Sequence, residues 1–182
     1  MAVFFRLLLT FSSLLLSFSV YLVASDYKIK IFSYTFNFLQ SISTYFFIVI
    51  VFSVITLFIA RFIHDLDFPV DSFESIEIAN DSFLPSYLGY FFVALSAASY
   101  DKPINLHSFL YVFFIMAIFI YCSRISFFNP IFLLFGYNFF YVTTKNGVKI
   151  ILITKKTIKD PLRFTSGKVK KINEYTYLDM EK

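Results

Sequence analysis

Long apolar runs with almost no charged residues are the feature that most constrains how this chain can fold. Four of them precede residue 124, at about 7–24, 45–63, 83–100 and 104–123. A helix of about 20 apolar residues is long enough to cross the hydrocarbon core of a bilayer. With 58% hydrophobic residues and a mean hydropathy of +0.73, the chain also lies outside the usual composition of soluble domains. The sequence therefore predicts a membrane all-α bundle of four transmembrane helices over residues 1–128.

Two parts of this region leave alternatives open. Residues 1–25 could be a cleaved signal peptide instead of a first span, because Arg6 precedes the apolar stretch and Val23-Ala24-Ser25 resembles a cleavage site. Residues 25–44 alternate aromatic and polar side chains. That alternation fits an interfacial strand, but the segment could equally be an early extension of the second helix.

Small side chains recur in the first and third apolar runs at helical spacing. Small residues allow two helices to approach closely inside a membrane. We therefore predict five helix-packing positions: Ser13, Ser17, Gly89, Ala94 and Ala98. The hydroxyl groups of the first run could instead line a lumen, so an oligomeric pore or channel subunit is the alternative function.

The last third of the chain is basic and has the pattern of strands. Asn129 and Pro130 interrupt the apolar run at 125–142, which we interpret as an interfacial segment, although the charge count accommodates a fifth span equally well. Asn146-Gly147 then separates two β-rich runs, and this dipeptide is a strong signal for a hairpin. A third strand is expected within 168–178. Residues 129–182 are thus predicted to form an interfacial segment and a small cytosolic β-hairpin module.

The distribution of charge orients the chain. Residues 143–182 contain ten Lys/Arg and four Asp/Glu, and basic residues stay on the cytoplasmic side of a membrane. We expect the C-terminus in the cytosol, on the same side as an acidic loop at 64–82. This loop is expected to contain a short strand or helix through Phe73, Ile76 and Ile78. The basic tail and the acidic loop can attract each other, and we expect them to bind a cytosolic partner through Lys155, Lys156, Lys159, Lys168, Lys170, Lys171, Asp71, Glu74 and Glu77.

The sequence contains no pattern that indicates chemistry. It has no nucleophile–base pair, no Gly-rich phosphate loop and no His/Cys spacing for a metal. The apolar runs contain no Asp, Glu or Lys, and such intramembrane charges are the usual mark of ion-coupled transport. We predict a protein that is not an enzyme, with no cofactor and no metal. Direct binding of nucleic acid is not expected either, since Tyr175 and Tyr177 offer few aromatic faces for bases.

Three segments of the last third carry a resemblance to a known family: Phe128-Asn129-Pro130-Ile131, Leu134-Phe135-Gly136-Tyr137 and the closing stretch 171–179. Together with the length, the four runs and the hairpin, they resemble KwaA, the membrane component of the Kiwa bacterial anti-phage system. The resemblance implies a homo-oligomer, such as a tetramer, in the bacterial inner membrane. It also implies a cytosolic effector, KwaB, as partner. We therefore expect a non-enzymatic, multi-pass sensor or scaffold that recruits this effector to the membrane.

Overall fold

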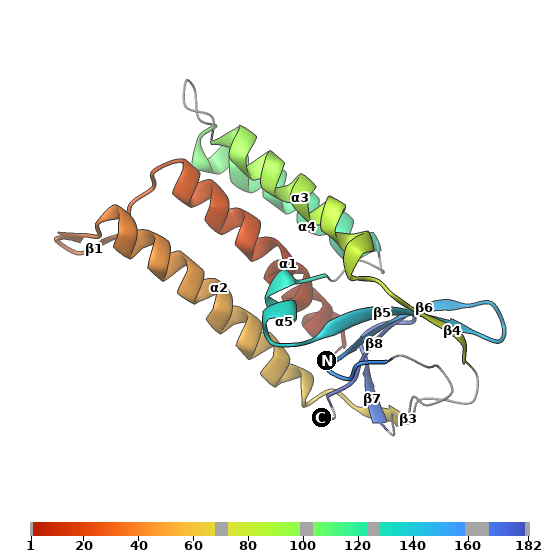
Figure 1. The fold of residues 1–182 in the computed structure, drawn as a ribbon. Coiled ribbons are helices and arrows are strands. Elements are labelled where there is room, and N and C mark those ends of the chain that lie inside the picture. The colour runs from red at the N-terminus through yellow and green to blue at the C-terminus, as the bar shows by residue number, and fades with distance from the viewer. Residues whose placement is uncertain (1, 68–72, 99–103, 124–127, 159–167, 181–182) are drawn as a thin grey trace.

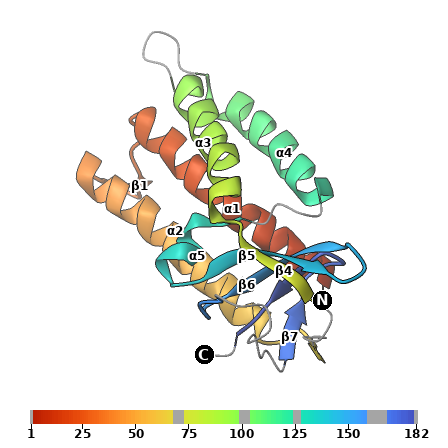
Figure 2. The same cartoon turned by 45° about the vertical axis from the view of Figure 1, so that its right-hand side comes forward.

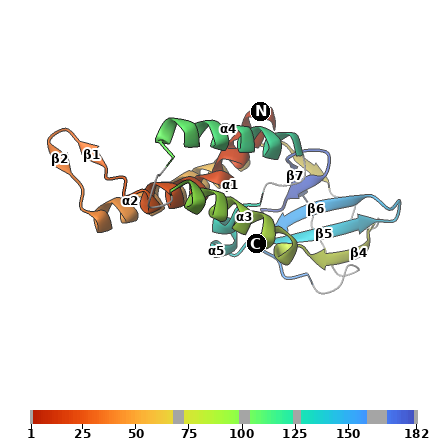
Figure 3. The same ribbon diagram turned by 90° about the horizontal axis from the view of Figure 1, so that it is seen from above.

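The computed structural model describes residues 2–67, 73–98, 104–123, 128–158 and 168–180, in which a group of helices adjoins a sheet (Figure 1). Four helices run side by side: α1 (Ala2–Ala24), α2 (Phe38–Ala60), α3 (Asn80–Ala97) and α4 (Leu106–Ser123). Helix α1 is the central one, because it contacts each of the other three. A larger sheet lies at one end of these helices, and a small hairpin lies at the opposite end (Figure 3).

This architecture shows that the predicted four-helix membrane bundle is wrong. By length and composition, α1 from Val3 onward and all of α2 could cross a membrane. Helix α3 begins at Asn80 and includes Asp81 and Pro85, so it is more polar than a run that begins at Phe83. The apolar stretch of α4, Leu106–Cys122, is shorter than the about 20 residues that a span needs. Within the described residues, two helices rather than four therefore have the character of a span.

The surface of α2 indicates what surrounds these helices. Half of the apolar window of α1 is buried (50%), whereas 22% of that of α2 is buried. The aromatic rings of Phe46, Phe47 and Phe58 are 45%, 65% and 55% exposed. A soluble monomer rarely exposes so large an apolar surface, because its contact with water is unfavourable. The outward face of α2 therefore indicates association with a membrane.

The strands at the other end form a six-stranded mixed sheet in the order β3-β7-β8-β6-β5-β4. Strands β6 and β8 pair in parallel, and the other neighbours are antiparallel. The two edge strands both come from the connection between α2 and α3, so the segment predicted as an acidic loop is part of the sheet. The strands are β3 (Asp65–Asp67), β4 (Phe73–Ile78), β5 (Asn138–Thr144), β6 (Lys149–Thr154), β7 (Lys168–Lys171) and β8 (Thr176–Leu178).

The predicted hairpin is present as β5 and β6. Its turn uses Gly147, which has a φ of +75° and donates its N–H to the Thr144 carbonyl oxygen at 2.8 Å. Glycine adopts this left-handed conformation without steric cost, and Asn146 does not adopt it. The expected third strand is divided into β7 and β8 by a turn in which the Tyr175 N–H donates to Asn173 Oδ1 at 2.7 Å.

Both faces of the sheet are buried, which explains why β5 and β6 are apolar at consecutive positions. Phe139 and Ile153 belong to a core that also includes residues of the helices, whereas Phe140 and Leu152 belong to a second core with Val169. Before β5 the chain forms only the short helix α5 (Pro130–Leu134), whose five residues are far too few to cross a bilayer. Residues 128–142 therefore form a short helix and a strand, not a fifth span.

The segment 25–44 contains both of the structures that its pattern allowed. Strands β1 (Lys30–Ile31) and β2 (Tyr34–Thr35) form a two-stranded hairpin, and α2 then begins at Phe38. The Asn37 backbone N–H donates to Gln40 Oε1 at 3.0 Å, which is half of a capping box at the start of a helix. The strand interpretation therefore holds before residue 36 and the helix interpretation after residue 37.

Candidate functional site

Lys170 on β7 joins the end of α2 to the edge strand β3. Its Nζ donates to the carbonyl oxygens of Ile63 at 2.7 Å and Arg61 at 3.1 Å, and it forms an ion pair with Asp65 Oδ1 at 2.7 Å. The carbonyl groups after a helix carry partial negative charge, so an ammonium group is favoured there. The hydrogen bond from Lys170 also lowers the pKa of the Asp65 carboxyl. The acidic and basic segments thus bind each other within the chain.

Three more of the residues predicted to bind a partner form ion pairs inside the chain. Lys156 pairs with the fully buried Asp179 at 3.4 Å, and Lys171 pairs with Glu174 at 2.9 Å. The bond to Glu174 raises the pKa of Lys171. Glu77 on the edge strand β4 pairs with Lys149 on β6 at 3.6 Å, across the intervening strand β5.

The remaining charged positions have different surroundings. Glu74 on β4 and Lys168 on β7 are exposed and form no ion pair within the described part of the chain. Lys155 places its Nζ 4.7 Å from the ring centroid of Tyr137. Lys159 and Asp71 lie outside the described residues. The sheet therefore presents unpaired acidic charge on β4 and unpaired basic charge on β7.

The predicted packing positions fall into two groups. Ser13, Ser17, Ala94 and Ala98 are buried, and the Tyr87 hydroxyl of α3 donates to the Ser13 carbonyl oxygen at 2.9 Å. Gly89 is exposed, and a Cβ built there would meet nothing within 4 Å. The hydroxyl stripe of α1 thus faces α3 within a single chain, so packing accounts for the feature that suggested a pore.

A buried polar cluster joins α1, α2 and α5. Asn129 Nδ2 donates to Ser12 Oγ at 2.5 Å and to Ser53 Oγ at 3.1 Å, and all three side chains are 0% exposed. The side-chain oxygen Oδ1 of Asn129 accepts the Ile131 N–H at 2.9 Å and caps α5. The sequence showed Asn129-Pro130 as a break in the apolar run, but it did not show which serines would meet this amide.

The end of α2 lies beside α5 and the sheet (Figures 1 and 2). Residues of this region line a pocket of about 280 Å³. Its lining combines the cations Arg61 and Lys155 with Tyr137 and apolar side chains of α2 such as Leu57. Burial raises the pKa of the Tyr137 hydroxyl, and the nearby Arg61 partly opposes this shift. Sequence reasoning missed the pocket because it brings together α2, the turn after α5, the end of β6 and Met180.

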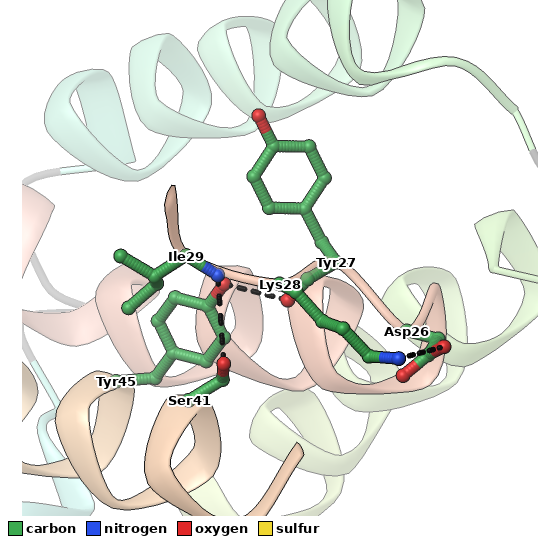
Figure 4. A network of polar contacts seen from close by, with 6 residues as sticks. All are labelled: Asp26, Tyr27, Lys28, Ile29, Ser41 and Tyr45. Atoms are coloured by element: carbon green, nitrogen blue, oxygen red, sulfur yellow. Dashed lines mark hydrogen bonds and ion pairs between the residues drawn. The ribbon is translucent and has the colours of Figure 1, made fainter. Parts of the chain in front are cut away.

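The opposite end of α1 and α2 is held by a second set of polar contacts (Figure 4). The Tyr45 hydroxyl donates to the Tyr27 carbonyl oxygen at 2.8 Å, and the Ile29 N–H lies 3.5 Å from Ser41 Oγ. These contacts fix the base of the β1–β2 hairpin, whose tip residue Phe32 is fully exposed (103%) and has a φ of +52°.

None of these arrangements supplies a metal site, since no three His, Cys, Asp or Glu side chains gather within the described residues. A family model described as "Anti-phage protein KwaA" matches residues 5–178. No curated protein and no solved structure matches the chain.

Proposed function

The chain belongs to the KwaA family of anti-phage defence proteins, and on that basis we propose that it is a non-enzymatic sensor and scaffold of the bacterial inner membrane. In this proposal α1 and α2 cross the membrane, the β1–β2 hairpin lies outside, and the six-stranded sheet lies in the cytosol. The sheet recruits a soluble effector protein, which the resemblance identifies as KwaB. Because the basic tail favours the cytoplasmic side, the hairpin faces the surface that a phage meets first.

The observation that carries this proposal is the way the sheet is attached to the helices. Residues 61–64 alone connect α2, which ends at Ala60, to edge strand β3. Ala79 alone separates the end of edge strand β4 from the start of α3. The Ala79 N–H also donates to the Phe139 carbonyl oxygen of β5 at 2.8 Å. Because the α2–β3 and β4–α3 connections are short, a displacement of α2 relative to α3 must move the two edges of the sheet. A sensor needs such a coupling between its membrane part and its partner-binding part.

Strand β4 is the edge that we assign to the effector. An edge strand presents unpaired backbone N–H and C=O groups, to which an extended segment of another protein can add. Glu74 gives this edge a negative charge that no described lysine or arginine pairs, and Ile78 is 64% exposed. A basic, extended segment of the effector fits such an edge.

The outward apolar face of α2 supports the remaining part of the proposal, a homo-oligomer such as a tetramer. Phe47 on this face is exposed in the single chain, and helices of separate copies can pack there within the membrane. The pore alternative receives no comparable support, because Ser13 and Ser17 are buried inside one chain.

Retention of the effector on isolated membranes tests the proposal. In the variant Glu74→Lys/Ile78→Lys, lysines on the edge strand should prevent pairing with a basic segment, and the effector should shift to the soluble fraction. The matched control changes the opposite edge, Asp67→Lys/Leu66→Lys, and should keep the effector on the membrane. If the effector remains bound to both variants, the β4 edge is not its docking surface.

A further inference from the structure

We infer that the pocket at the end of α2 binds the headgroup and the first part of the acyl chains of an anionic phospholipid. The inference rests on the proposed function in one respect only, namely that α2 lies in a membrane. It concerns a site that is separate from the β4 edge proposed for the effector.

The charges that line the pocket are positive and unpaired. Arg61 lies 6.0 Å from the ring centroid of Phe58, and Lys155 lies 4.7 Å from that of Tyr137. An aromatic face attracts a cation but does not neutralise it. Neither cation forms an ion pair with a carboxylate within the described residues. Two cations that share one cavity favour an anion between them.

The nearest carboxylate of the tail is already engaged. Asp179 is fully buried, accepts the Thr154 hydroxyl at 3.0 Å and pairs with Lys156 at 3.4 Å. Its charge is therefore balanced by Lys156 and leaves the pocket with a positive excess.

The walls of the pocket distinguish a lipid from other anions. Arg61 directly follows the last residue of α2, whereas Val54, Leu57 and Phe58 of the same wall lie within the helix. If α2 spans the bilayer, the two cations lie at the depth of the headgroups and these side chains lie at the depth of the acyl chains. A free phosphate ion would contact the two cations alone. An acidic peptide would leave the apolar wall, which continues into the membrane, without a contact. A phospholipid uses both parts, with its phosphate between Arg61 and Lys155.

Native mass spectrometry of the full-length protein in nanodiscs tests this assignment. The nanodiscs contain phosphatidylcholine and phosphatidylglycerol in equal amounts, and the protein should retain phosphatidylglycerol preferentially. In Arg61→Gln/Lys155→Gln the affinity for phosphatidylglycerol should fall about 30-fold, since each cation near an anionic surface contributes roughly fivefold. The control Lys145→Gln/Lys168→Gln removes the same charge from the sheet outside the pocket and should retain the lipid.

The competing occupants give different results. If soluble glycerol phosphate displaces the lipid at equal concentration, the pocket is a site for a free phosphate group and the lipid assignment is wrong. Equal loss of lipid in both double variants would show a diffuse attraction to the surface and would also overturn it. If membrane-inserted, folded protein retains no phosphatidylglycerol, this inference fails while the proposed function stands. If the protein is not inserted at all, the proposed function fails first.

Discussion

The substitution Asn129→Leu tests whether the buried polar cluster holds α5 against the two membrane-length helices. Leucine is branched at Cγ like asparagine and is somewhat larger, so the change removes hydrogen bonds without leaving a cavity. It deletes the bonds to Ser12 Oγ and Ser53 Oγ and the cap on the Ile131 N–H. The two serines keep their mutual contact at 3.3 Å, so neither is left without a partner.

The expected cost follows from these three bonds. Loss of a helix N-cap costs about 1 kcal/mol. Hydrogen bonds between membrane helices contribute on average about 0.6 kcal/mol each, with about 1.7 kcal/mol as an upper value. The free energy of unfolding should therefore fall by about 2–3 kcal/mol.

The matched control is Asn105→Leu. Asn105 Oδ1 accepts the Ser108 N–H at 2.8 Å at the exposed start of α4 and makes no bond to another helix there. This control should lose only the cap, or about 1 kcal/mol. Reversible unfolding in mixed micelles, followed by circular dichroism, measures both changes.

A double-mutant cycle makes the test sharper. In the background Ser12→Ala/Ser53→Ala, the cost of Asn129→Leu should drop to that of the control, because only the cap remains to be lost. The reasoning is refuted if Asn129→Leu and Asn105→Leu cost the same in the unchanged protein, or if the serine substitutions leave the cost of Asn129→Leu unaltered.

Three further predictions concern the sheet and its junction with the helices. Lys170 lowers the pKa of Asp65. Their contact therefore stabilises the fold above the ordinary Asp pKa of about 3.9, and this stabilisation is lost as the pH falls through the lower pKa of the folded state. The substitution Asp65→Asn should remove this acid-dependent step from thermal unfolding curves. Burial raises the pKa of Tyr137. The neutral Tyr137 hydroxyl therefore contributes its full stability below about pH 10, and this contribution is lost as the pH rises further. Between about pH 9 and pH 11 the melting temperature of Tyr137→Phe should fall less than that of the unchanged protein. Gly136 has a φ of +79° and open space where a Cβ would lie, so Gly136→Ala should destabilise the protein by about 1 kcal/mol through the backbone alone. The substitution Gly89→Ala within α3 should instead stabilise the protein by up to about 1 kcal/mol. Equal shifts of the melting temperature in the two variants would contradict this.

Local signals in the sequence identified several elements correctly. The Asn146-Gly147 dipeptide predicted the β5–β6 hairpin, because tight turns between two strands favour residues that can adopt positive φ. Asn129-Pro130 was identified only as an interruption of the apolar run. The structure shows that α5 begins there, since asparagine caps a helix and proline suits its first turn. The family could also be identified from the last third of the chain.

Long-range pairing was not visible in the sequence. The parallel pairing of β6 with β8, and the pairing of β3 with β7 across about 100 residues, depend on contacts that no local pattern encodes. The acidic loop lacked the strict alternation of a half-buried strand, because β4 contains a register shift between Phe73 and Ser75. Its membership in the sheet was therefore missed.

The membrane prediction failed for two helices for a physical reason. Apolar runs identify buried helices as well as spanning ones, and both satisfy the same hydropathy pattern. Helix α3 begins with the polar residues Asn80 and Asp81. The side-chain oxygen Oδ1 of Asn80 accepts the Phe139 N–H at 2.9 Å. That contact ties the beginning of α3 to the sheet, so its first turn is part of the sheet junction.

Accessibility of single cysteines in intact cells tests most directly whether α1 and α2 separate the hairpin from the sheet. In a Cys122→Ser background, Phe32→Cys lies at the hairpin tip and Glu74→Cys lies on the β4 edge. A membrane-impermeant maleimide should label Phe32→Cys in cells whose outer membrane has been opened, and should label Glu74→Cys only after the inner membrane is permeabilised. Labelling of both cysteines from the same side, or recovery of the protein in the soluble fraction, would contradict the account.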